Sequence, residues 1–160
     1  MAQTVIDKNR HRIVGACLIY NPARQFLIIK RHQNLKVYPS LWTVPGGGMD
    51  RTDYESLPQS SPDGWESPLE AALRREILEE AGIKVGNIEY LSHFTFIRPD
   101  NIPVFGIRFA APYASGDVVL DPKDSTEFAW ISADKAGEYD LLGRIADEMR
   151  EFDEKLRTRE

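Results

Sequence analysis

The chain has 160 residues, of which 42% are hydrophobic, 10% aromatic and 28% charged, so it is long enough to bury a core and is typical of a one-domain globular protein. Its single cysteine, Cys17, cannot form an internal disulfide, and there is no Cys/His cluster of the kind that holds zinc. The formal net charge of −5, from 20 Lys plus Arg against 25 Asp plus Glu, argues against nonspecific binding of a nucleic-acid polymer, and an anionic substrate would need a bound cation to offset the repulsion.

The first residues, MAQTVIDKNRHR, are polar, and no long apolar run follows them. We therefore expect no signal peptide, no membrane-spanning helix and no membrane partner, and we predict a cytoplasmic protein. Residues 1–160 are predicted to form one domain.

Strands are predicted at residues 12–20, 26–31, 88–97, 104–111 and 126–131, where β-branched, aliphatic and aromatic residues gather. The turn residues Asn21 and Pro22 separate the first two segments, which are therefore predicted to form a hairpin. YASGD (113–117) favours a turn. Helical and strand-like segments are interspersed, so the fold class is predicted to be α/β, with helices packed on a mixed sheet.

A loop is predicted at residues 51–66, because two Pro, one Gly and three Ser occur there without helical or alternating periodicity. A loop of this length inside a compact domain is uncommon, and it is often functional or mobile. We consider two hypotheses for this loop: it is a lid or specificity element beside an active site, or it is a tolerated surface insertion.

The strongest helix signal is SPLEAALRREILEEAG (67–82). Ser67 is expected to be the N-cap and to form a capping box with Glu70, while Pro68 suits the first helical position. Leu73 and Ile77 continue an apolar stripe, and Gly82 is expected to end the helix. A second helix is predicted from about residue 134 to the end of the chain.

Glu76, Glu79 and Glu80 stand at i, i+3 and i+4 near the end of the first helix, so their carboxylates share one helix face. Their mutual repulsion, and the helix dipole at that end, disfavour this arrangement unless a cation binds between them. Carboxylate oxygens suit Mg²⁺ or Mn²⁺. The alternative is a solvated charged face, in which Arg75 pairs with Glu79 and Arg74 pairs with Glu70.

A glycine run, PGGG at 45–48, precedes the loop, and glycines let a backbone approach a ligand closely. The stretch from Gly47 to Ile83 resembles the Nudix box, which is Gly, five residues, Glu, seven residues and then Arg-Glu-U-x-Glu-Glu-x-Gly-U, where U is aliphatic. REILEEAGI (75–83) matches its second half at every defined position. In the first half a loop intervenes, and Glu66, in GWESP, is the expected counterpart of the first glutamate.

The resemblance implies an α/β/α sandwich that acts as a pyrophosphohydrolase on a nucleoside diphosphate linked to another moiety. It implies that Glu76, Glu79, Glu80 and the main chain of Gly47 hold Mg²⁺ or Mn²⁺, and that Arg75 orients the carboxylates. The general base comes either from the box or from a later acidic residue, for which Glu127 is a candidate that a role as a surface residue also explains.

Substrate recognition is less strongly encoded. Arg31 could bind phosphate, and Tyr38, Trp42 and Trp65 could stack on a base, although Trp42 also suits the core. The expected partner is a small nucleotide-type substrate, and the resemblance is compatible with a homodimer. Alternatives are a nucleotide sensor of the same fold without turnover and a nonenzymatic interaction domain, which would leave the carboxylate cluster unexplained.

Overall fold

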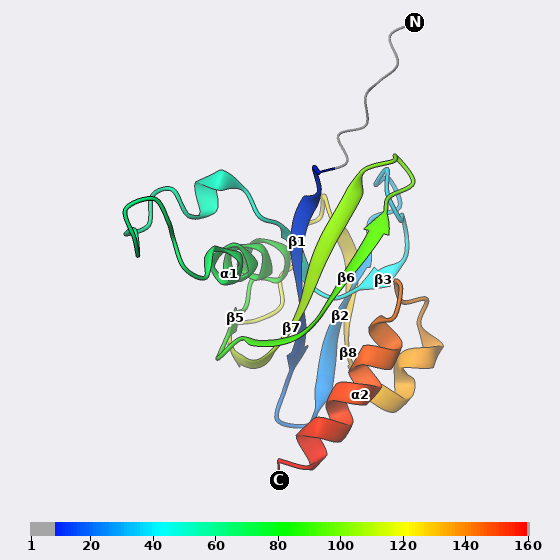
Figure 1. The fold of residues 1–160 in the computed structure, drawn as a ribbon. Helices are drawn as coiled ribbons and strands as arrows, with labels where there is room; N and C mark the ends of the chain where they lie inside the picture. Colours follow the sequence, from blue (N-terminus) through cyan, green and yellow to red (C-terminus); the bar gives the residue numbers. More distant parts are fainter. Residues whose placement is uncertain (1–8, 160) are drawn as a thin grey trace, which may run out of the picture.

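The computed structural model describes residues 9–159 of the chain. These residues form an eight-stranded mixed sheet, with α1 (Pro68–Ala81) on one face and α2 (Ile145–Arg157) on the other (Figure 1), which confirms the predicted fold class. Residues 1–8 and 160 lie outside the described part, and with them the ends of the predicted domain 1–160 and most of the polar stretch MAQTVIDKNRHR. No helix within residues 9–159 is long and apolar enough to cross a membrane.

The strands are β1 (Arg12–Tyr20), β2 (Gln25–Arg31), β3 (Trp42–Thr43), β4 (Gly46–Gly48), β5 (Lys84–Val85), β6 (Glu89–Ile97), β7 (Pro103–Ser115) and β8 (Ser125–Ser132). The predicted hairpin of β1 and β2 is confirmed, but the two strands pair only at Tyr20 and Phe26. Beyond that point β1 pairs with β7 in parallel and β2 pairs with β8. Because β4 pairs with β1 and β3 with β2, these two short strands lie in the gap between the diverging strands.

The core consists of two apolar layers, because successive side chains of a strand point to opposite faces of the sheet. Toward α1, the sheet presents side chains such as Cys17, Ile19 and Leu27 to Leu73 and Ile77. Toward α2, it presents Leu18, Phe26 and Ile28 to Met149 and Phe152. The direction of each strand side chain therefore tells which helix it faces.

The N-terminus of α1 differs from the predicted capping box. Ser67 is the N-cap, but its backbone is left-handed, with φ 55°, and its side chain makes no capping hydrogen bond. An N-cap side chain normally reaches the first turn from an extended backbone, so this conformation directs the hydroxyl elsewhere. The C-terminus agrees with expectation, since Gly82 has φ 69° and donates its N–H to the Leu78 carbonyl at 2.9 Å.

The sequence predicts one helix from about residue 134 to the end of the chain, but the structure has two separate helices there. A 3-10 helix, η2 (Ala133–Glu138), ends at the extended residue Tyr139, and α2 begins only at Ile145. Gly143, with φ 55°, lies in the break. Tyr139, Leu141 and Leu142 in this connection pack against the core, and the apolar spacing of the two leucines had merged the connection with the helix. The predicted turn at 113–117 also begins later, because β7 continues to Ser115.

Candidate active site

The carboxylates of α1 lie against the glycine strand β4. Glu80 accepts a hydrogen bond from the Gly46 N–H, with 2.9 Å between N and Oε2. The Glu76 carboxylate lies so close to Gly47 that a Cβ there would overlap it. A side chain is also excluded at Gly46, where it would strike the carbonyl of Gly15 and the backbone of Ala16. The glycine run therefore allows two helix carboxylates to approach a strand backbone.

Burial makes the charge of these two carboxylates costly. Burial raises the pKa of Glu80 to about 8; the Gly46 N–H opposes this shift, and the nearby Glu76 adds to it. Burial likewise raises the pKa of Glu76, against the pull of Arg75. Glu79 differs, because 59% of its side chain is exposed and it pairs with Arg75 at 3.0 Å. Two desolvated carboxylates beside each other favour either a shared proton or a bound cation.

Arg75 connects the helix to the start of the predicted loop. Its guanidinium pairs with both oxygens of Asp53, and its Nη1 lies 3.0 Å from Glu76 Oε1 and 3.0 Å from Glu79 Oε2. The hydrogen bond from Arg75 lowers the pKa of Asp53, whose side chain is only 3% exposed. The expected role of Arg75 in orienting Glu79 is thus compatible with its contacts, which also include Glu76 and the Gly48 carbonyl at 3.4 Å.

Asp53, rather than the predicted Glu66, is the acidic residue between the glycine run and α1 that contacts Arg75. It follows Gly47 after five residues, which is the spacing of the Nudix box, and it ends the short 3-10 helix η1 (Arg51–Asp53). Glu66 is exposed on the far side of the insertion and makes no ion pair within the described residues. The spacing points to Asp53, although the signature has glutamate at this position. The insertion therefore begins after Asp53.

Arg31 lies near the carboxylate cluster, on the same face of the sheet as α1. It donates from Nε to the Tyr38 carbonyl at 3.0 Å and from Nη2 to the Val37 carbonyl at 2.7 Å. Burial lowers its pKa, whereas the charges of Glu80 and Asp124 oppose this shift. Asp124 also raises the pKa of Glu80, so this exposed carboxylate lies close to both groups. Asp124, in the DSTEFAW segment, is therefore a neighbour of the site that no motif in the sequence indicated.

Glu127, the predicted alternative base, lies elsewhere. It is opposite Lys30 in the β2–β8 register, it pairs with Lys30 at 3.0 Å, and 56% of its side chain is exposed. Lys30 points to the α2 face of the sheet, whereas Arg31 points to the α1 face. The structure therefore does not bring Glu127 together with Glu76 and Glu80.

The three candidate stacking residues occupy three different environments. Trp42 packs edge-on against Tyr139, with ring centroids 5.1 Å apart, and joins the α2 layer of the core. Trp65 packs on Tyr54 within the insertion, at 5.2 Å, and donates its Nε1–H to a carbonyl there. Tyr38 is half-buried and lies 6.2 Å from Phe96 of β6.

The donor set fits a hard divalent cation, although the side chains do not form a closed metal cage. No group of three His, Cys, Asp or Glu residues within residues 9–159 is arranged to hold a metal ion. However, Glu80 Oε1 makes no protein hydrogen bond in this part of the chain, and the main chain of Gly47 lies against Glu76. Carboxylate and carbonyl oxygens of this kind are the ligands that Mg²⁺ accepts alongside several waters.

Comparisons with known proteins agree with this geometry. The NUDIX domain model matches residues 9–156. The fold is similar to the MutT protein of Methanosarcina mazei Go1, with a TM-score of 0.70 and 25% identity, over 92% of this chain and 96% of that one. It is also similar to the NUDIX domain of Shewanella oneidensis NrtR in complex with ADP ribose, with a TM-score of 0.71 and 15% identity, over 92% and 89% of the two chains.

Curated sequences match a shorter stretch. The chain is 37% identical over 78 residues to the NAD-capped RNA hydrolase NudC of Shigella dysenteriae serotype 1, which covers 49% of this chain and 29% of that protein. It is 41% identical over 66 residues to NudC of Escherichia coli strain K12 / DH10B, which covers 41% and 24%. The chain thus spans only 24% to 29% of the length of these relatives.

Proposed function

This chain belongs to the Nudix family, and from that premise we propose that it is a divalent-metal-dependent pyrophosphohydrolase, which cleaves the diphosphate linkage of a nucleoside diphosphate joined to another group. The observation that carries the proposal is the position of Glu76 and Glu80, two desolvated carboxylates held against the glycine strand. A solvated charged face, the alternative for these residues, would not bury them.

The residues present fit Mg²⁺ or Mn²⁺, and Glu76, Glu79, Glu80 and the Gly47 carbonyl would hold it. When bound, such an ion neutralises a diphosphate, polarises a P–O bond and lowers the pKa of a water that attacks phosphorus. Arg75 keeps the Glu76 and Glu79 carboxylates in position, and Asp53 in turn fixes Arg75.

Arg31 and Asp124 act at the edge of the same site. The Nε and Nη2 of Arg31 are held by loop carbonyls, so the guanidinium is fixed near Glu80 and can bind a phosphate oxygen of the substrate. Asp124, exposed and close to both groups, can take the proton of the attacking water, and it replaces Glu127 as the candidate base outside the helix.

Two of the compared proteins support the substrate class by their names, which mention NAD-capped RNA and ADP ribose. NAD and ADP ribose both contain a nucleoside diphosphate joined to a second group. We assign this chain the small nucleotide rather than an RNA polymer, since its net charge of −5 provides no basic surface for a polyanion.

The test is hydrolysis of ADP-glucose, GDP-glucose and UDP-glucose with Mg²⁺, with Mn²⁺ and with EDTA, measured as release of glucose 1-phosphate. We expect turnover that requires metal, and a loss of at least about a hundredfold in kcat for Glu80→Gln and Glu76→Gln. Glu70→Gln, on the same helix but away from the cluster, is the matched control and should keep full activity. Tight nucleotide binding without turnover of any substrate would instead favour the sensor.

A further inference from the structure

Arg108, in the middle of β7, is a buried arginine whose donors are only partly used. Only 8% of its side chain is exposed, and its Nε donates to Glu148 of α2 at 2.8 Å. Its Nη1 and Nη2 make no hydrogen bond to the protein within residues 9–159. No fully buried polar side-chain atom in this range lacks a partner, so both Nη groups reach solvent. The two Nη groups thus keep four N–H donors in contact with solvent.

The sheet places Arg108 at a defined separation from the carboxylate site. Arg108 is opposite Ala16 of β1, and Ala16 is opposite Gly46 of β4, whose N–H binds Glu80. Neighbouring strands lie about 4.8 Å apart, so the backbones of Arg108 and Gly46 are about 10 Å apart along one row of the sheet. Arg108 points to the α2 face of the sheet, whereas Glu80 of α1 binds the edge of β4 that does not pair with β1. A nucleotide whose diphosphate lies at Glu80 therefore has to pass around this edge of β4 to bring its base to Arg108.

Aromatic rings lie beside Arg108 on the α2 face of the sheet. The guanidinium of Arg108 lies over the Phe94 ring, 5.0 Å from its centroid. Phe94 and Phe96 are stacked at 6.1 Å, and Tyr38 lies 6.2 Å from Phe96. All three rings are half-buried and so remain partly open to solvent. This aromatic row, Tyr38–Phe96–Phe94, offers π-faces to a planar group, whichever base it carries.

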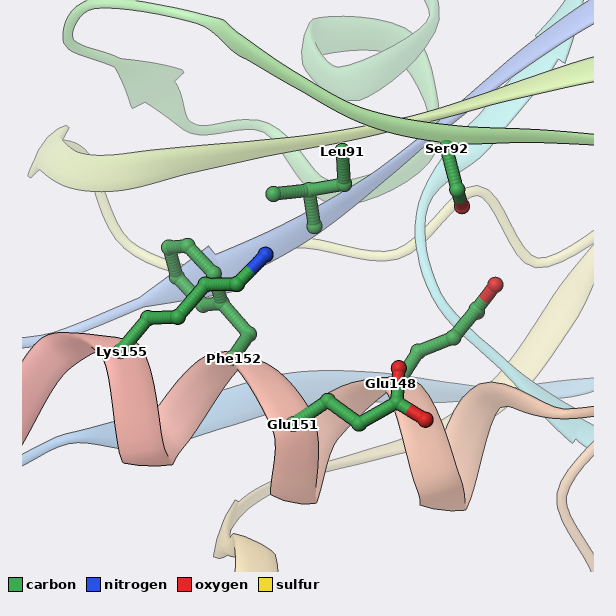
Figure 2. A pocket seen from close by; sticks show the side chains of 6 residues that line it. All are labelled: Leu91, Ser92, Glu148, Glu151, Phe152 and Lys155. Atoms are coloured by element: carbon green, nitrogen blue, oxygen red, sulfur yellow. The ribbon is translucent and has the colours of Figure 1, made fainter.

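Glu148 fixes Arg108 from the other side. Figure 2 shows its side chain extending from α2 toward β6, where Ser92 lies. The cavity at this place measures about 50 Å³, which accommodates water but no nucleobase. A ligand therefore meets Arg108 on the aromatic side and not through this cavity.

The charge of the surroundings decides which ligand fits. Glu148 already neutralises Arg108, and the acidic Glu151 lines the same cavity, so a phosphate or carboxylate would be repelled. A neutral planar group with two adjacent acceptors can use both Nη groups while it stacks on the rings. The O6 and N7 atoms of a 6-oxopurine are such a pair, whereas adenine presents an N6 donor there.

We propose that Arg108, held by Glu148 above the aromatic row, determines specificity by binding the O6/N7 edge of a 6-oxopurine base of the substrate. The assignment rests on the proposed function only in that the base belongs to the nucleotide whose diphosphate lies at Glu80. The binding of a nucleoside monophosphate tests it without turnover.

The direct test is calorimetric titration with GMP and with AMP, which are both bicyclic and differ on the edge in question. The wild type should bind GMP at least about tenfold more tightly. In Arg108→Lys, which keeps the charge beside Glu148 but loses the planar donor edge, this preference should fall to about one. Arg159→Lys, which alters a surface pair with Glu89, is the matched control and should keep it. Equal affinities in the wild type, or an equal loss for both nucleotides in Arg108→Lys, would overturn the assignment.

A second variant leaves the ion pair intact. Phe96→Ala removes part of the aromatic row and should weaken GMP and AMP alike, by about fivefold or more; unchanged affinity for both would contradict the assignment. Hydrolysis of GDP-glucose and ADP-glucose separates the two proposals. Equal kcat/KM for GDP-glucose and ADP-glucose would contradict the proposed base site but leave the proposed hydrolase activity supported. GMP binding that depends on Arg108, without hydrolysis of either substrate, would contradict the proposed hydrolase activity but support the proposed base site.

Discussion

The burial of Glu80 should lower the free energy of unfolding when its carboxylate is charged, and this effect can be measured. Glu80→Gln keeps an acceptor for the Gly46 N–H and removes a buried charge. In the folded protein the pKa of Glu80 is raised from 4.5 to about 8, so the proton on Glu80 stabilises the fold below pH 4.5, and that stability is lost as the pH rises through 8. At 1.36 kcal/mol for each pKa unit, the loss approaches about 5 kcal/mol.

Glu80→Gln carries no such charge, so we expect its stability relative to the parent protein to increase as the pH rises. Thermal unfolding in EDTA should give similar melting temperatures for both proteins at pH 5. At pH 8.5 the variant should melt higher by roughly 10–20 °C, at about 2–4 °C for each kcal/mol in a chain of this size. Mg²⁺ should stabilise only the parent. Equal melting temperatures at both pH values, with Glu70→Gln as the control, would refute the claim that Glu80 is held desolvated.

Four further variants probe the remaining parts of the site. Asp53→Asn should cost about 2 kcal/mol in urea unfolding, because it weakens a charged hydrogen bond to Arg75, and it should lower kcat; an unchanged midpoint would contradict this role. Arg31→Met should raise KM for the diphosphate substrate by about tenfold or more in steady-state kinetics, and an unaltered KM would exclude phosphate binding. Glu127→Gln should have the same pH–rate profile as the wild type, whereas replacing a general base would remove the acidic limb of the profile. Replacing residues 55–65 by a short Gly-Ser link should preserve the fold, because Asp53 remains, and should change kcat/KM for at least one substrate; identical values for all would leave the segment a tolerated insertion.

Local signals in the sequence were sufficient for the centre of the site. The apolar stripe and Gly82 located α1, and the i, i+3, i+4 spacing placed three carboxylates on one helix face. Their different burial could not be predicted from the spacing. Glu76 and Glu80 are buried by β4, which is distant from them in the sequence. Glu79, which has the same spacing, remains largely exposed.

The residues that sequence reasoning missed depend on contacts between distant segments. Arg108 lies 40 residues from Glu148, and no periodicity relates the two positions. Asp124 lies near Glu80 because it directly precedes β8, where its carbonyl accepts the His32 N–H, whereas Glu127, three residues later, points to the other face. Asp53 is the exception, since its distance from Gly47 was visible in the sequence.

The break before α2 shows a limit of periodicity. Leu141 and Leu142 continued the apolar spacing of the C-terminal helix, but they pack against the core from the connection between η2 and α2. Gly143, with φ 55°, marks the place where the chain turns into α2. A glycine followed by a charged residue within an apolar run was the available sign of this break.

The central claim is that water attacks a nucleotide diphosphate at the Glu76–Glu80 site. The most direct measurement is ³¹P NMR of the products that form from GDP-glucose and Mg²⁺ in ¹⁸O-labelled water. We expect GMP and glucose 1-phosphate, with ¹⁸O on one of the two phosphates, from the wild type and no product from Glu80→Gln. An intact diphosphate with the wild-type protein, or labelled products formed equally by Glu80→Gln, would contradict it.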